Sequence, residues 1–199
     1  MADLKKKGSL IFTYATVGAG KSAQLIGEIR RYRKTNNTIK VIVPEVGCLR
    51  DGVFVKSRNG EQETASMLPS GVCPFDFLSY NAIDILLLDE AQFLSAKQVS
   101  GLCRLADERG TDVLAYGLRT DFKGNPFEGT SYLMAWADSI RELPSSSDLE
   151  QYEFATMNMI SENHALTPSD LKNTIQPGFH YIAVSRAKFD LKTRWEPKS

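Results

Sequence analysis

The segment Ala15–Ser22 has the residue types and order of a phosphate-binding loop, because it ends in Gly-Lys-Ser. It lies between a β-rich run, Leu10–Tyr14, and a stretch with helical spacing, which is the context that such a loop requires. Backbone N–H groups of the turn and the helix N-terminus would form an anion site. Lys21 would neutralise phosphate oxygens, and the Ser22 hydroxyl would ligate Mg²⁺. The predicted phosphate-binding residues are Ala15, Thr16, Val17, Gly18, Ala19, Gly20, Lys21 and Ser22.

An ordinary tight turn is the alternative for this segment. The strict pattern has Gly where this chain has Ala15, and Gly-Lys-Ser or Gly-Lys-Thr alone occurs by chance in roughly one chain in ten of this length. The strand–loop–helix context favours phosphate binding over that alternative.

An acidic pair, Asp89 and Glu90, follows the nearly continuous apolar run Ile83–Leu88. Such a run is expected for a parallel strand buried on both faces, and α/β proteins place ligand chemistry at the carboxyl ends of such strands. Asp89 would hold Mg²⁺, directly or through water, and Glu90 would accept the proton of an attacking hydroxyl. The alternative is that both carboxylates only cap the following helix. Two independent motifs in the right order favour the catalytic interpretation.

Three aromatic residues, Phe93, Phe122 and Phe127, follow expected strand ends in segments rich in Gly, Asp and Asn. Stacking on aromatic rings is a simple way to hold a flat heterocycle. For each ring alone, a place in the core is the more common role. Their shared position on the site side of the sheet nevertheless favours binding of a base.

Strands and amphipathic helices alternate from Leu10 to about Leu143, which favours a parallel sheet with helices on its faces. The predicted strands are Leu10–Tyr14, Ile39–Val43, Ile83–Leu88 and Val113–Gly117. Helical spacing relates Leu25, Ile26, Ile29 and Tyr32, then Val99, Leu102, Cys103 and Ala106, and finally Leu133, Trp136, Ala137 and Ile140. Ser95 and Gln98 have the spacing of a capping box, and Gly110 would end that helix.

The composition changes at Pro144–Asp148, and the chain beyond it is poorer in periodic patterns. Two β-like runs, Tyr152–Ile160 and His180–Val184, are separated by a polar stretch containing proline and glycine. We therefore expect a nucleotide-binding core over residues 1–143 and a small, loop-rich β subdomain over residues 144–199.

Composition and charge exclude several classes of protein. The chain has 199 residues, of which 24 are basic and 24 acidic, so that its formal net charge is zero. This argues against a protein that coats nucleic acid, which needs clustered excess cations. No apolar run approaches the roughly 20 residues that span a bilayer, and Met1–Lys7 lacks the features of a secretory signal. The three cysteines, Cys48, Cys73 and Cys103, are scattered. We therefore expect a cytoplasmic protein with neither a disulfide framework nor a thiolate zinc site.

Longer segments of the sequence resemble the cytosolic (type II) thymidine kinases. They are Gly20–Ser22, Asp89–Phe93, Tyr116–Phe127 and Ser131–Asp138, and the resemblance covers most of residues 9–143. It implies a RecA-like P-loop core, a homotetramer and transfer of the γ-phosphoryl group of ATP to the 5′-hydroxyl of thymidine, with Mg²⁺ as cofactor. The partners would be thymidine and ATP, with neither nucleic acid nor a membrane.

The resemblance also assigns roles to residues. It implies that Glu90 is the general base and that Lys21, Ser22 and Asp89 contact the phosphates and Mg²⁺, with Ala91 and Gln92 beside them in the ATP site. The thymidine pocket would contain Phe93, Leu118, Phe122 and Phe127, together with Tyr181 from a lasso-like loop over the base. Arg50 and Arg58 match arginine-containing segments of the family, but the sequence assigns neither of them a role.

The resemblance weakens after Leu143. Family members usually carry a zinc ribbon with Cys or Cys and His ligands, and the residues near those positions here are Leu149, Gln151, Ser185 and Lys188. Because none of these is a zinc ligand, zinc is predicted to be absent. We expect the lasso to be held by packing around Tyr152, Phe154, Phe179 and Phe189 instead. A non-catalytic relative and a nucleoside kinase with another base preference, such as deoxyuridine, stay open as alternatives, and a RecA-type ATPase stimulated by nucleic acid is a more distant one.

Overall fold

The structure is a computed structural model that describes residues 7–78, 82–149, 153–161 and 180–189. Predictions made for Gln151, Tyr152, Phe179 and the proline-containing stretch between the two C-terminal strands lie outside the described residues. The described residues include the predicted phosphate-binding segment, the acidic pair and all predicted nucleoside-binding residues.

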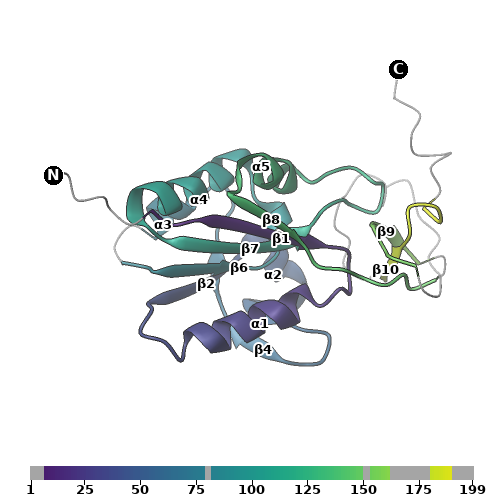
Figure 1. Cartoon of the computed structure of the whole chain (residues 1–199), viewed down its shortest axis with the longest axis horizontal. Coiled ribbons are helices and arrows are strands. Elements are labelled where there is room, and N and C mark those ends of the chain that lie inside the picture. The colour runs from purple at the N-terminus through teal and green to yellow at the C-terminus, as the bar shows by residue number, and fades with distance from the viewer. Residues whose placement is uncertain (1–6, 79–81, 150–152, 162–179, 190–199) are drawn as a thin grey trace, which may run out of the picture.

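A six-stranded parallel sheet forms the centre of the molecule (Figure 1). Its order is β5 (Ser66–Leu68), β2 (Ile39–Pro44), β6 (Ile85–Leu88), β7 (Asp112–Leu118), β1 (Leu10–Ala15) and β8 (Ser139–Glu142). Every neighbouring pair in this sheet runs parallel. The predicted α/β fold with a parallel sheet is therefore confirmed.

Helices cover both faces of the sheet, because its central strands alternate apolar side chains between the faces. Leu86 and Leu88 of β6 pack in the cluster that includes α4 (Ala96–Arg109) and α5 (Glu128–Trp136), while Ile85 and Leu87 pack in the cluster of α1 (Lys21–Tyr32). In Figure 1, α4 and α5 lie above the sheet, together with the short α3 (Pro74–Phe77), and α1 lies below it.

Local signals define the ends of α4 as the sequence predicts. The Ser95 hydroxyl accepts a hydrogen bond from the Gln98 N–H, and the Gln98 side chain accepts one from the Ser95 N–H, which completes the capping box. Gly110 ends the helix in the left-handed region, with φ of 71°.

The predicted helix around Leu133–Ile140 is wrong in its second half. Helix α5 ends at Trp136, and Ile140 belongs to the edge strand β8, where its side chain is exposed. The Asp138 carboxylate accepts a hydrogen bond from the Leu10 N–H at 2.8 Å, and the Asp138 N–H donates to the Leu10 carbonyl at 2.9 Å. Residues 139–142 thus pair with the open edge of β1 instead of continuing the helix. The helical spacing of apolar residues does not show that this strand is available as a partner.

Three smaller elements lie between β2 and β5 or follow β6. They are α2 (Glu45–Asp51), the antiparallel hairpin β3 (Phe54–Lys56) and β4 (Gln62–Thr64), and the 3₁₀ turn η1 (Ala91–Phe93). No element was predicted from the sequence in the region between Pro44 and Ile83. The elements there are short, so that they contain too few residues for a periodic pattern.

The C-terminal region forms a separate two-stranded antiparallel sheet of β9 (Met157–Ile160) and β10 (Tyr181–Val184), which lies beyond one end of the main sheet (Figure 1). The strand predicted over Tyr152–Ile160 is therefore shorter than expected. Phe189 is buried against Met157, Ile182 and Val184, as the packing hypothesis requires.

The part of that hypothesis that concerns Phe154 is wrong, because this side chain is 75% exposed. Its backbone forms only an isolated bridge to Ser146, which leaves the ring outside the small core. Within the described ranges, no helix has the length and apolar character needed to cross a membrane.

Two glycines offer a test of this packing. A Cβ at Gly129 in α5 would lie 2.7 Å from the backbone oxygens of Ala91 and Leu94, whereas a Cβ at Gly27 in α1 would meet nothing within 4 Å. We expect Gly129→Ala to lower the free energy of unfolding by about 1–3 kcal/mol, because backbone carbonyls cannot move aside easily. Gly27→Ala should raise it by roughly 0.5–1 kcal/mol. Urea unfolding measures both, and equal effects would contradict the packing described here.

Candidate active site

One cleft of about 610 Å³ opens at the carboxyl edge of the parallel sheet. Its walls come from the segments that follow β1, β2, β6 and β7, together with the β3–β4 turn and residues of the C-terminal hairpin. Because the carboxyl ends of parallel strands meet at one edge, residues far apart in the sequence converge here. The cleft brings together the phosphate-binding segment, the second residue of the acidic pair and the predicted aromatic residues.

The phosphate loop, residues Ala15–Ser22, makes the turn from β1 into α1 that the sequence predicts. Gly18 and Gly20 adopt positive φ angles of 76° and 86°, which favour glycine. The first turn of α1 carries no acidic side chain, so the positive end of the helix dipole is available to an anion. The Lys21 ammonium donates to the Thr16 carbonyl at 2.6 Å, which holds it across the loop.

The acidic pair is joined to the phosphate loop through Asp89. The Ser22 hydroxyl donates to Asp89 Oδ2 at 2.9 Å, and the Glu90 N–H donates to Asp89 Oδ1 at 3.0 Å. Burial, and then the nearby charge of Glu90, raise the pKa of Asp89 to about 7. A hydroxyl beside a buried carboxylate with a second acid next to it is a donor set that suits Mg²⁺, so the residues present fit this cation.

Glu90 is held in a strained conformation at the wall of the cleft. It is the one described non-glycine residue with positive φ, at 55°, and such strain is found where surrounding contacts fix a functional side chain. The Gln92 amide donates to the Glu90 carboxylate, and Gln92 Oε1 accepts from the Leu118 N–H at 3.0 Å. Gly47 of α2 approaches from the other side, where a Cβ would lie 3.0 Å from that of Glu90.

These contacts argue against the capping alternative. Glu90 occupies the N-cap position of η1, but its side chain makes no capping hydrogen bond, and the following helix α4 is capped by Ser95. The Glu90 carboxylate instead lines the cleft.

The aromatic residues that line the cleft form two pairs. Phe93 and Phe127 meet edge to face with ring centroids 5.7 Å apart, and Phe122 and Tyr181 lie 6.3 Å apart. Phe122 and Phe127 are buried, and both line the cleft. Leu118 lines the same space, which gives the cleft an apolar end suited to a flat ring.

Asn158, which was not predicted from the sequence, joins the C-terminal hairpin to the site. Its Oδ1 accepts from the Val17 N–H of the phosphate loop at 2.9 Å, and its Nδ2 donates to the Thr120 carbonyl at 2.7 Å. The side chain is only 3% exposed, so both bonds are formed away from bulk water. The one signal in the sequence was an amide side chain between Met157 and Met159 in a predicted strand.

The structure separates the predicted residues into two groups. Those that line the cleft are Val17, Gly18, Ala19, Gly20, Lys21, Ser22, Glu90, Gln92, Phe93, Leu118, Phe122, Phe127 and Tyr181. Four others, Ala15, Thr16, Asp89 and Ala91, are buried beneath it. Asp89 reaches the site through Ser22, whereas Ala15 and Ala91 have only backbone or methyl groups with which to support it. The cleft also includes Arg58, to which no role was assigned from the sequence, and Gly47, Thr120, Asp121 and His180, which were not predicted to belong to the site.

The positions where a zinc ribbon was considered show other contacts. The Lys188 N–H donates to the Ser185 hydroxyl at 3.3 Å, and Leu149 is half exposed. In the part of the chain that the structure describes, no group of three or more His, Cys, Asp or Glu side chains is placed to hold a metal ion. The absence of zinc remains a prediction.

Comparison with known proteins agrees with this geometry. The sequence model of the thymidine kinase family matches residues 8–163. The chain is 34% identical to the thymidine kinase of Enterobacteria phage T4 over 192 residues, which cover 94% of this chain and 97% of that protein. It is 30% identical to the thymidine kinase of Xanthomonas campestris pv. campestris (strain 8004), covering 94% and 91%. It is also 40% identical to that of Yersinia pseudotuberculosis over 139 residues, covering 67% and 70%.

We predict that Asn158→Asp weakens binding of MgATP about tenfold. The new oxygen cannot donate to the Thr120 carbonyl, and the new charge lies beside the phosphate loop. Isothermal titration calorimetry measures the affinity, with Asn37→Asp as the control because Asn37 is exposed and its side chain bonds, within the described part of the chain, to Thr35 alone. Equal affinities for the two variants would contradict the role assigned to Asn158.

Proposed function

The chain belongs to the thymidine kinase family, and on this premise we propose that it transfers the γ-phosphoryl group of ATP to the 5′-hydroxyl of thymidine. The products are thymidine 5′-monophosphate and ADP. The observation that carries this proposal is that one cleft contains the phosphate loop, the strained Glu90 and two aromatic pairs. Phosphoryl transfer depends mainly on positioning and charge neutralisation, which this set of residues supplies.

Glu90 acts as the general base in the proposed reaction. Its carboxylate takes the proton of the 5′-hydroxyl as the new bond from that oxygen to Pγ forms. The bond from Pγ to the oxygen that bridges it to the β-phosphate breaks at the same time, and ADP leaves with those electrons. The Gln92 amide and the Gly47 backbone limit where the Glu90 carboxylate can lie, so that little reorganisation is needed during the reaction.

The phosphate loop binds the triphosphate in this proposal. Lys21 and the N–H groups at the start of α1 neutralise phosphate oxygens. Ser22 and Asp89 would hold Mg²⁺, which when bound adds positive charge next to the same oxygens. Ala91 and Gln92 support the site from η1, and Gln92 does so by orienting Glu90.

The aromatic end of the cleft binds the nucleoside. Phe93 with Phe127 and Phe122 with Tyr181 provide ring faces and edges for the base, and Leu118 adds apolar surface. Residues 1–143 would then supply the phosphate loop, the base and most of the nucleoside pocket, while residues 144–199 complete the site with Tyr181 at the nucleoside and Asn158 at the phosphate loop. The contact of Gly124 with Phe189 supports this division, since it brings the C-terminal core against the loop that bears Phe122.

The resemblance to the family and the charge of the chain also bear on localisation, oligomeric state and partners. We propose a cytoplasmic homotetramer that acts on free nucleosides without zinc, a membrane or nucleic acid. The resemblance to the family supports the tetramer, and the zero net charge of the chain supports the absence of nucleic acid as a partner.

Glu90→Gln tests the assignment of the base. We expect kcat to fall on the order of 10²–10⁴-fold, because the amide cannot accept the proton, while KM for thymidine changes little. The measurement is a phosphorylation assay with ATP, Mg²⁺ and a panel of nucleosides, and Glu142→Gln in the exposed edge strand is the control. An equal loss of kcat and thymidine affinity would assign Glu90 a structural role instead.

The nucleoside panel also decides between the proposed function and its alternatives. Thymidine 5′-monophosphate made by the parent protein supports thymidine phosphorylation. Product from another nucleoside alone would indicate a changed base preference. ATP binding without any nucleoside product would indicate a non-catalytic relative, and ATP hydrolysis stimulated by DNA would indicate an ATPase that acts on nucleic acid.

A further inference from the structure

The β3–β4 hairpin places a cation, Arg58, in the wall of the cleft. Arg58 lies in the turn between β3 and β4 and lines the cleft together with Ser57 and Asn59. Its side chain is exposed, and none of the ion pairs among the described residues involves it. An arginine that faces a cleft without such an ion pair is available to an anionic ligand.

Arg58 lies directly against the phosphate loop. A Cβ built on Gly18 would be only 2.6 Å from Arg58 Nη1 and 3.2 Å from Nη2. Because Gly18 carries no side chain, the guanidinium can approach the loop backbone at this point. The loop thus has Lys21 within it and a second cation next to it, on a separate element.

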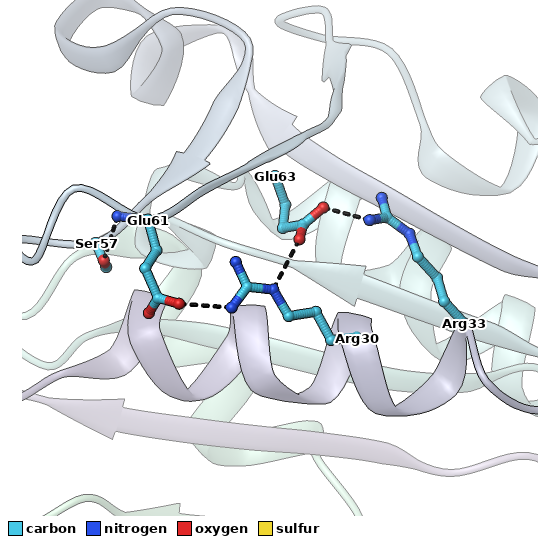
Figure 2. Close-up of polar contacts among 5 residues, drawn as sticks. All are labelled: Arg30, Arg33, Ser57, Glu61 and Glu63. Carbon is cyan, nitrogen blue, oxygen red and sulfur yellow. Dashed lines mark hydrogen bonds and ion pairs between the residues drawn. The ribbon is translucent and has the colours of Figure 1, made fainter.

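Ion pairs hold this hairpin on helix α1 (Figure 2). Arg30 Nη1 lies 2.5 Å from Glu61 Oε1, and Arg30 Nε lies 3.0 Å from Glu63 Oε1. Arg33 forms a second ion pair with the Glu63 carboxylate. Burial opposes ionisation of Glu63, but the hydrogen bonds from Arg30 and Arg33 outweigh it and lower the pKa of this carboxyl. Glu63 therefore remains charged at neutral pH.

Hydrogen bonds within the β3–β4 turn connect Arg58 to the residues that form these ion pairs. The Ser57 N–H donates to the Glu61 carbonyl at 2.9 Å, and the Glu61 N–H donates to the Ser57 hydroxyl at 3.2 Å.

The hairpin also packs on α1 through buried side chains. Ser57 is buried, and Val55 of β3 is fully buried in the cluster with Leu25, Ile26 and Ile29 of α1. The turn that bears Arg58 is thereby fixed to the helix that begins at Lys21, so both cations belong to one connected unit.

We propose that Arg58 binds the triphosphate of ATP and that Arg30, Glu61 and Glu63 are positioning residues that hold it at the phosphate loop. The inference rests on the proposed function and adds a residue to it. A triphosphate carries more negative charge than Lys21 and one Mg²⁺ neutralise together, so a further cation at this place lowers the energy of the bound state and of the transition state. The planar guanidinium can donate two hydrogen bonds to one phosphate group.

Substitution of Arg58 tests its contact with the ligand. We expect Arg58→Ala to weaken binding of MgATP about tenfold and to lower kcat/KM for ATP on the order of 10²-fold. Arg58→Lys should restore part of the MgATP affinity and part of kcat/KM, since lysine keeps the positive charge but lacks the paired donors of the planar guanidinium. Affinity for thymidine, measured without ATP, should stay within about twofold of that of the parent.

Substitution of Arg30 tests the positioning. We expect Arg30→Ala to lower kcat/KM for ATP by roughly three- to tenfold, as its ion pairs with the hairpin are partly exposed. The matched control is Arg31→Ala, because Arg31 is adjacent on the same helix and, among the described residues, contacts Glu28, one turn away, and the neighbouring Tyr32 ring. In the Arg58→Ala background, Arg30→Ala should have no further effect, since a residue that acts through Arg58 has nothing left to position.

Two results would overturn the proposal. One is an affinity of Arg58→Ala for MgATP within about twofold of that of the parent. The other is that Arg58→Ala loses thymidine binding as well as MgATP binding and that Arg58→Lys restores neither. That result would show that Arg58 is needed for folding. A parent protein that makes no thymidine 5′-monophosphate would refute the proposed function, while the MgATP affinities would still decide the role of Arg58. A parent protein that does not bind MgATP would overturn both.

Discussion

The rest of the site depends on the hydrogen bonds that the buried Asp89 carboxylate accepts. This carboxylate accepts hydrogen bonds from the first turn of α1 through Ser22 and from the backbone of Glu90. These bonds join the loop after β1 to the end of β6, so the phosphate site and the base share one anchor. The same burial raises the pKa of Asp89, and a bound cation would relieve that unfavourable environment. A site of this kind has unfavourable electrostatics when empty and favourable electrostatics when filled.

The nucleoside side of the cleft is tied to this anchor by two further contacts. Asn158 bonds both the phosphate loop and the Thr120 carbonyl, and Phe189 packs against Gly124 in the loop that carries Phe122. The small C-terminal hairpin therefore depends on the core for its position, and the core depends on the hairpin to complete one wall. This mutual dependence explains how a short segment with a four-residue apolar core, in the part that the structure describes, holds its place.

Much of this architecture was predictable because it is determined locally. The alternating strands and helices, the capping box of Ser95 with Gln98 and the stop at Gly110 each depend on residues close together in the chain. The phosphate loop was predictable for the same reason, since its chemistry lies within eight consecutive residues. Predictions failed where a partner distant in the sequence decided the outcome. Ile140 lies in a strand because the open edge of β1 pairs with that segment. Phe154 is exposed because the apolar core of the C-terminal hairpin does not include it.

The sequence by itself determined the fold class, the phosphate loop, the acidic pair and the aromatic residues, because residue type and local spacing specify them. Only the tertiary structure decided which of these residues face the cleft, since Asp89 and Glu90 are neighbours in sequence but the first is buried and the second lines the cavity. It also decided that Asn158 and Arg58 belong to the site. No spacing relates these residues to the phosphate loop, and the packing of the two hairpins against the core alone brings them there.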